Sequence, residues 1–172
     1  MSLAHKLLAE FDSQAPITRT FLERLPENKL TWKPHTKSMT AGQLAYHLAM
    51  VPGNVSRGSQ QNEIQVPEFA LPQPASRKEI LDAFDRSVAT VREVLSGYDD
   101  AALNATWRIM AGTEEMLAVP RVWFLRNIML NHWYQHRGQF SVYLRILNIA
   151  VPSSWGPSAD EQAAFQPELH PA

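Results

Sequence analysis

The fold prediction for this sequence rests mainly on one stretch, residues 126–147, RNIMLNHWYQHRGQFSVYLRIL. The stretch contains no proline and a single glycine, so little in it would interrupt a helix. Its two histidines, His132 and His136, are four residues apart and therefore share one face of a helix. We expect both imidazoles to point toward an apolar interior, because the same stripe carries Leu125, Ile128, Met129, Phe140, Tyr143 and Leu147.

The composition is that of one globular domain spanning residues 1–172. Hydrophobic residues make up 45% of the chain and charged residues 19%, and the formal net charge is −1. This balance gives no electrostatic reason to expect nucleic acid or an anionic membrane as a partner. No run approaches the roughly 20 apolar residues of a membrane helix, and the N-terminus has no apolar core of a signal peptide, so we expect a cytoplasmic protein.

The chain has no cysteine. Disulfides and thiolate–metal sites are therefore excluded, and a transition-metal site would need nitrogen and oxygen ligands.

Three further helices precede the histidine-bearing one. Residues 2–25 follow a helical apolar stripe, with a kink predicted at Pro16 and an end at Pro26. Thr40 and Gln43 have the spacing of a capping box and predict the start of a second helix. Pro52-Gly53 predicts the end of that helix, or a break in it, and residues 76–97 predict a third helix that opens with another capping-box pattern (Ser76 and Glu79).

The connections are less regular. Residues 60–75 are rich in proline and predict a long loop, whereas residues 104–119 lose the helical period and predict either a short hairpin or an irregular crossover. Pro120 suits the first turn of the fourth helix, and a short capped turn is predicted at 158–161 before a loose tail. The predicted fold class is all-α, a four-helix bundle with a long crossover connection.

His47 is a third candidate metal ligand, because it lies within the apolar stripe of the second helix. A single histidine on such a stripe is more often a hydrogen-bonded core residue, but a pair at i and i+4 can bind one ion, and a third strengthens that hypothesis. A set of three would leave coordination positions open, as in catalytic sites. The remaining histidines, His5, His35 and His170, are interpreted as solvated.

The sequence offers no evident protein base beside the histidine pair. In the HExxH pattern of zinc proteases the second residue is glutamate, but here it is Trp133, and the nearest polar neighbour on the face is Gln139. Asp160 and Glu161 are interpreted as first-turn acids, and they are also the only candidates for a proton acceptor. Two further sets receive a structural interpretation: Trp107, Trp123 and Tyr143 as core aromatics that could line a pocket, and Arg126, Arg137 and Arg145 as a solvated face.

Two segments resemble the DinB-like superfamily of four-helix metalloproteins. The segments are LERLPENKLTWKPHTKSMTAGQLAYHLA and HWYQHRGQFSVYLRILNIAVPSSWGPSADE, and the resemblance extends from the first helix to Glu161. It implies a four-helix bundle, a metal triad at His47, His132 and His136, a divalent ion that is usually nickel or zinc, and a homodimer. Relatives in that superfamily include bacillithiol-dependent S-transferases and a mycothiol-dependent isomerase, and others have been named as metal-dependent hydrolases.

Three hypotheses follow for function. The leading one is a metal-dependent enzyme that transfers a low-molecular-weight thiol to an electrophile through a metal-bound thiolate, because a thiol needs less activation than water. The second is a hydrolase that uses metal-bound hydroxide, and the third is a non-catalytic metal-binding or stress-related protein. The triad suits nickel, zinc or manganese, and it does not identify the small-molecule substrate.

Overall fold

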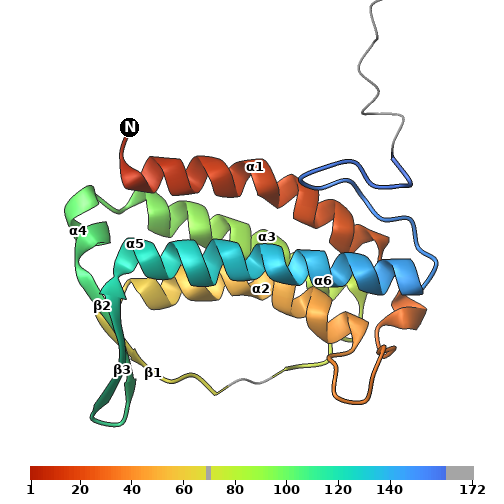
Figure 1. The fold of residues 1–172 in the computed structure, drawn as a ribbon, viewed down its shortest axis with the longest axis horizontal. Coiled ribbons are helices and arrows are strands. Elements are labelled where there is room, and N and C mark those ends of the chain that lie inside the picture. Colours follow the sequence, from red (N-terminus) through yellow and green to blue (C-terminus); the bar gives the residue numbers. More distant parts are fainter. Residues whose placement is uncertain (69–70, 162–172) are drawn as a thin grey trace, which may run out of the picture.

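The computed structural model describes residues 1–68 and 71–161, and it is mostly helical (Figure 1). Four long helical segments pack lengthwise against one another, with α2 in contact with α3 and α6, and α1 in contact with α3 and α6. In the part of the chain that is described, no helix is long and apolar enough to cross a membrane. The helices are α1 (Leu3–Arg24), η1 (Glu27–Lys29), α2 (Ala41–Ser59), α3 (Arg77–Ser96), α4 (Asp100–Asn104), α5 (Arg121–Phe124), η2 (Leu125–Asn131) and α6 (His132–Ile146).

A three-stranded sheet at one end of the helices corrects the all-α prediction. Its strands are β1 (Glu63–Gln65), β2 (Thr106–Ala111) and β3 (Glu114–Pro120), in the order β1-β2-β3. β2 and β3 are antiparallel and meet at a turn where Gly112 has a φ of 61°, so the hairpin alternative for residues 104–119 is confirmed. β1 pairs in parallel with β2, and it was missed because three residues carry no detectable alternation.

The prediction that α2 ends or breaks at Pro52-Gly53 is wrong, since α2 continues to Ser59. Pro52 has no amide hydrogen for the Leu48 carbonyl one turn earlier, but the indole of Trp133 donates to that oxygen at 2.9 Å. Gly53 allows α3 to approach closely, because a Cβ there would lie 2.8 Å from the Cα of Ser87. A tertiary hydrogen bond from Trp133 therefore replaces the helical hydrogen bond that Pro52 cannot donate, and the helix continues.

The helix starts follow the sequence closely. The Thr40 hydroxyl accepts from the Gln43 amide at 3.1 Å and the Gln43 side chain accepts from the Thr40 amide at 3.0 Å, so the capping box of α2 is confirmed. At α3 the Ser76 hydroxyl accepts from the Glu79 amide, but the Glu79 carboxylate accepts from the amide of Ala75. Pro120 precedes α5 as its cap and does not lie within it.

The fourth helical segment contains a π-helix, η2, directly before His132. The His132 amide donates to the carbonyl of Asn127, five residues earlier. One extra residue in a turn rotates everything that follows by roughly 100° relative to a pure α-helix. Trp133 and Arg137 consequently face the core, whereas His132 and His136 are half-buried against His47, so the prediction that the imidazoles point into the interior is confirmed only in part.

Arg137 is buried with 2% of its surface exposed, which corrects its assignment to a solvated face. Its guanidinium donates to the side chain of Gln14 at 2.7 Å and to the hydroxyl of Thr18 at 3.2 Å, and it lies over the ring of Tyr134. Arg126 pairs with Glu10 through two contacts of 2.6 Å, while Arg145 lies at the surface. The burial of Arg137 cannot be predicted from the sequence pattern, because its hydrogen-bond partners lie on α1, more than a hundred residues away.

The aromatic predictions divide. Trp107 is fully buried and stacks on Phe124, and Tyr143 is buried with its ring against Trp32, so both are core residues. Trp123 is 43% exposed and is not a core residue. His170 and the predicted tail lie outside the described residues.

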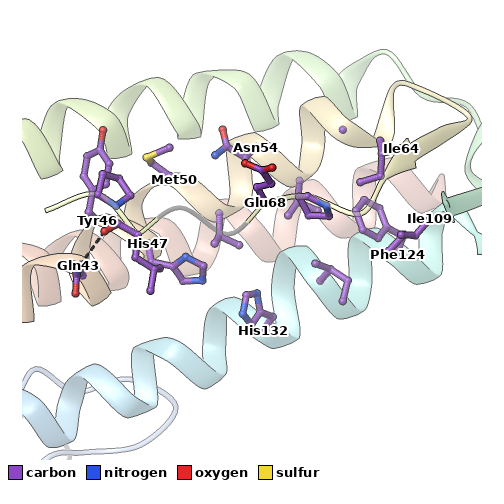
Figure 2. A pocket seen from close by; sticks show the side chains of 17 residues that line it. Gln43, Tyr46, His47, Met50, Asn54, Ile64, Glu68, Ile109, Phe124 and His132 are labelled. Carbon is purple, nitrogen blue, oxygen red and sulfur yellow. Dashed lines mark hydrogen bonds between the residues drawn. The ribbon is translucent and has the colours of Figure 1, made fainter. Parts of the chain in front are cut away.

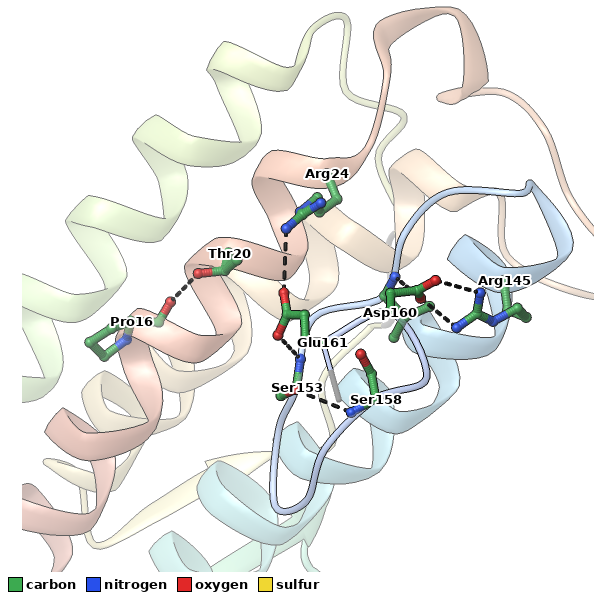
Figure 3. A network of polar contacts seen from close by, with 9 residues as sticks. Pro16, Thr20, Arg24, Arg145, Ser153, Ser158, Asp160 and Glu161 are labelled. Carbon is green, nitrogen blue, oxygen red and sulfur yellow. Dashed lines mark hydrogen bonds and ion pairs between the residues drawn. The ribbon is translucent and has the colours of Figure 1, made fainter. Parts of the chain in front are cut away.

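The predicted turn at 158–161 is present, but its acids serve a different role (Figure 3). Asp160 accepts from the amide of Val151 and pairs with Arg145 at 2.5 Å, while Glu161 accepts from the amide of Ser153 and contacts Arg24 at 3.4 Å. The Arg145 guanidinium lowers the pKa of Asp160, and the Ser153 amide lowers the pKa of Glu161. They fasten the C-terminal loop to α1 and α6.

Candidate metal centre

His47, His132 and His136 come together between α2 and the start of α6. One ligand nitrogen from each ring lies within 4.8 Å of the other two. The ring centre of His47 is 5.3 Å from that of His132 and 4.7 Å from that of His136. Figure 2 shows the rings of His47 and His132 on facing elements. The three residues named from the sequence are therefore brought together, whereas His5 and His35 are exposed elsewhere.

The surroundings of His47 and His132 favour the neutral imidazole, which is the form that binds metals. Burial, followed by the nearby His136 and His132, lowers the pKa of His47 to about 4. Burial and the neighbouring His136 also lower the pKa of His132, and the backbone carbonyl of Ile128 opposes this shift. Lone pairs are consequently available near neutral pH.

The rings are also oriented to present nitrogen to one point. Nδ1 of His136 lies 2.9 Å from the side-chain oxygen of Gln139, which favours a proton on Nδ1 and a free lone pair on Nε2. That Nε2 lies 2.7 Å from Nε2 of His132. Two nitrogens bound to one ion at about 2.1 Å are roughly 3.0–3.4 Å apart, so a small outward movement would admit an ion. The three residues thus fit a divalent metal.

A hydrogen bond from a neighbour of His132 to a neighbour of His47 connects the two elements that carry the triad. The Trp133 indole, next to His132 in sequence, donates to the carbonyl of Leu48, next to His47. Trp133 is almost fully buried and stacks on Phe11 of α1 with ring centres 5.2 Å apart. The missing amide of Pro52 therefore leaves a carbonyl free at the place where α2 and α6 must be held in register.

A pocket of about 410 Å³ begins at His47 and His132 and extends along α2 toward the sheet (Figure 2). This volume is within the range of small-molecule sites. His47 and His132 lie in its wall, which is otherwise mainly aliphatic and aromatic, with Met50, Ile64 and Phe124 among the residues that line it. The Gln43 side chain donates to the carbonyl of Leu71 at 2.8 Å and so holds one edge of the pocket to α2.

Glu68 is the acidic residue of the pocket lining, and the sequence reading missed it. It is exposed and follows β1 in an irregular segment, where no period or motif marks it. Asp160 and Glu161, the acids named from the sequence, do not line this pocket, because they are held in the C-terminal loop. Asn54 supplies a further polar group to the lining.

The model of the DinB superfamily matches residues 10–140. This chain belongs to the DinB superfamily. It is also 26% identical to the uncharacterized protein YrdA of Bacillus subtilis (strain 168) over 159 residues, which are 92% of this chain and 91% of that one.

Two solved structures show the same fold. A DinB-like protein from Bacillus cereus ATCC 10987 superposes with a TM-score of 0.71 at 23% identity, over 87% of this chain and 95% of that one. The DinB-like protein YjoA from Bacillus subtilis gives 0.64 at 17% identity, over 91% and 97% of the two chains. This chain therefore has a mostly helical, DinB-like fold with a small three-stranded sheet, and its three histidines could hold a metal ion.

Proposed function

We propose that this chain is a metal-dependent enzyme that transfers a low-molecular-weight thiol to an electrophilic substrate. His47, His132 and His136 would hold the ion, with nickel or zinc the leading candidates and manganese a further one. The observation that carries the proposal is a converging histidine triad, two of whose members, His47 and His132, lie in the wall of a largely apolar pocket.

When bound, the ion supplies Lewis-acid chemistry and lowers the pKa of a thiol or of water. The chain supplies the remaining requirements. Gln139 sets the tautomer of His136, and the apolar wall excludes water from the sulfur and accommodates an apolar electrophile. A thiol, with a free pKa of about 8.5, needs far less activation than water, so thiol transfer places the smallest demand on the protein.

The test is a transfer assay with purified protein loaded with nickel or zinc. Bacillithiol, mycothiol and glutathione are each offered 1-chloro-2,4-dinitrobenzene, in which sulfur bonds to the ring carbon, chloride leaves and the thiol proton is released. We expect turnover above the uncatalysed rate with one thiol, its loss in His136→Ala and its retention in His35→Ala. If none of the thiols gives metal-dependent turnover, this function fails.

One observation favours hydrolysis as a second candidate. Glu68 lines the same pocket as His47 and His132 and could accept a proton from water, a task that Asp160 and Glu161 are not placed to perform. The hydrolytic version predicts that Glu68→Gln abolishes cleavage of 4-nitrophenyl butyrate while the metal content stays unchanged. Unchanged ester cleavage in Glu68→Gln would remove this candidate.

A further inference from the structure

A second groove, of about 330 Å³, adjoins the pocket of the metal centre. Tyr46, Met50 and Asn54, on successive turns of α2, line both cavities. The second groove continues between α2 and α3, where Gly53 and Ser87 allow the two helices to come close together. A molecule that lies over Met50 and Asn54 can therefore occupy both.

The second groove is positively charged. Arg57 from α2 and Arg86 from α3 line it, and no acidic residue among the described residues 1–68 and 71–161 does. Neither guanidinium makes an ion pair with any residue in the described ranges, although most other described arginines are paired. The Arg57 guanidinium donates to the Thr90 hydroxyl at 3.3 Å, which directs it across the groove. Two like charges in one concave site favour an anion, and guanidinium groups bind carboxylate or phosphate with two hydrogen bonds.

The adjoining pocket does not cancel this charge. Within the part of the chain that the structure describes, Glu68 is the one acidic residue that lines this pocket, so the described lining of the two cavities carries a net positive charge. Arg57 lies ten residues after His47 on α2, which is about 15 Å of helix rise, and the long side chains of both arginines shorten the distance that a ligand must span. This separation suits a small molecule of roughly 10 Å with a reactive or apolar part at one end and an acid at the other.

We propose that Arg57 and Arg86 form an anion subsite that holds the carboxylate end of a molecule whose other end reaches the histidine centre. The inference rests on the proposed function, because it assigns the substrate of that site as an amphiphilic acid. The acid belongs either to the thiol or to the electrophile, and the probes below separate these two sources.

The experiment measures binding by isothermal titration calorimetry to the full chain, with and without zinc. Glutathione represents a thiol that carries carboxylates, octanoate represents an apolar acid, and octanamide is its neutral analogue. The variants are Arg57→Gln and Arg86→Gln. Arg92→Gln is the matched control, because it removes the same charge from α3 at a side chain that pairs with Asp12.

We expect Arg57→Gln and Arg86→Gln each to lower the affinity for one of the two acids about tenfold, as for loss of a charge-assisted hydrogen bond. The affinity for octanamide and the folded state should stay unchanged. Arginine-dependent binding of glutathione assigns the acid to the thiol, and arginine-dependent binding of octanoate assigns it to the electrophile. Arg92→Gln should bind as wild type.

Three results would overturn the subsite: affinity for both acids unchanged in both variants, an equal loss in Arg92→Gln, or binding that requires zinc but neither arginine. Zinc content, measured on the same samples, separates this failure from that of the proposed function. Because the titrations are also run without zinc, an empty histidine centre leaves the test of the arginines intact.

Discussion

His136 and Arg137 are consecutive residues of α6, but they belong to two polar clusters, a histidine cluster and an arginine cluster, that differ in their hydrogen-bond partners. Arg137 is buried, and its guanidinium donates to Gln14 and Thr18 on α1. His136 is half-buried, and beyond its contact with Gln139 its ring faces His132 and His47.

Buried polar groups normally find complementary partners, and the arginine cluster follows this rule. The three imidazoles of the histidine cluster face one another instead, and Nε2 of His136 lies 2.7 Å from Nε2 of His132. The arginine cluster therefore holds α1 and α6 together, whereas the histidine cluster could hold a metal ion. The predictions below change one cluster at a time.

The largest effect is expected from His136→Ala on metal-dependent stability. Zinc at about a thousand times its Kd should raise the free energy of unfolding of the wild type by about 4 kcal/mol, and it should leave the variant unchanged because one of three ligands is lost. Thermal unfolding with and without zinc measures this. His35→Ala, at an exposed site in a loop, should respond like the wild type. Equal stabilisation of His136→Ala would mean that zinc binds elsewhere.

Arg137→Met should lower the stability of the fold and leave zinc binding intact, the opposite of His136→Ala. It removes hydrogen bonds to Gln14 and Thr18 and leaves their buried oxygens without that donor, which should lower the free energy of unfolding by about 2 kcal/mol. Urea unfolding measures the loss, and zinc per folded chain should remain as in the wild type. Arg145→Met, on the exposed end of the same helix, should cost much less. A loss of zinc in folded Arg137→Met would contradict the separation of the two clusters.

Gln139→Ala changes the histidine cluster without removing one of the three histidines. Its side-chain oxygen accepts from Nδ1 of His136, so its removal frees the ring to turn and should weaken zinc binding about tenfold, with little change in stability. Competition with a chromogenic chelator measures the affinity. Gln135→Ala, at an exposed position of α6, is the matched control. Unchanged affinity would show that the tautomer of His136 is set by something else.

Glu10→Gln should have the smallest effect, and the effect should depend on pH. The hydrogen bonds from Arg126, with a contribution from Tyr134, lower the pKa of Glu10 despite its partial burial. Its contribution to stability is therefore complete above the ordinary glutamate pKa near 4.3, and it is lost as the pH falls through the lowered value.

At pH 7 the free energy of unfolding of the wild type should be about 0.5 kcal/mol higher than that of Glu10→Gln. The difference is small because the Glu10–Arg126 pair is partly exposed and screened by solvent, and it should vanish in acid. Urea unfolding at a series of pH values checks this. A difference that grows as the pH falls would reverse the sign and refute the assignment.

Local patterns predicted the helices and the members of the triad. The capping residues and apolar stripes predicted the starts of α2 and α3 and both ends of α1 and α3 to within a few residues, and the helical spacing of His132 and His136 pointed to a site that His47 joins. These features depend on neighbours within about one turn, which a sequence displays directly.

What escaped prediction depends on distant partners. The π-helix η2 left His132 and His136 half-buried and turned Arg137 into the core, and a 3.6-residue period cannot reveal such an extra residue. The continuation of α2 past Pro52 relies on the Trp133 indole, and the place of Glu68 in the pocket relies on the path of the segment after β1.

The most direct test of the account is the metal content of the tag-free wild-type protein, measured by elemental mass spectrometry after dialysis against nickel and zinc. The account predicts about one divalent ion per chain, bound by the three histidines. Wild-type protein that emerges empty and takes up neither ion would contradict it, and the histidine cluster would then join the arginine cluster as internal structure.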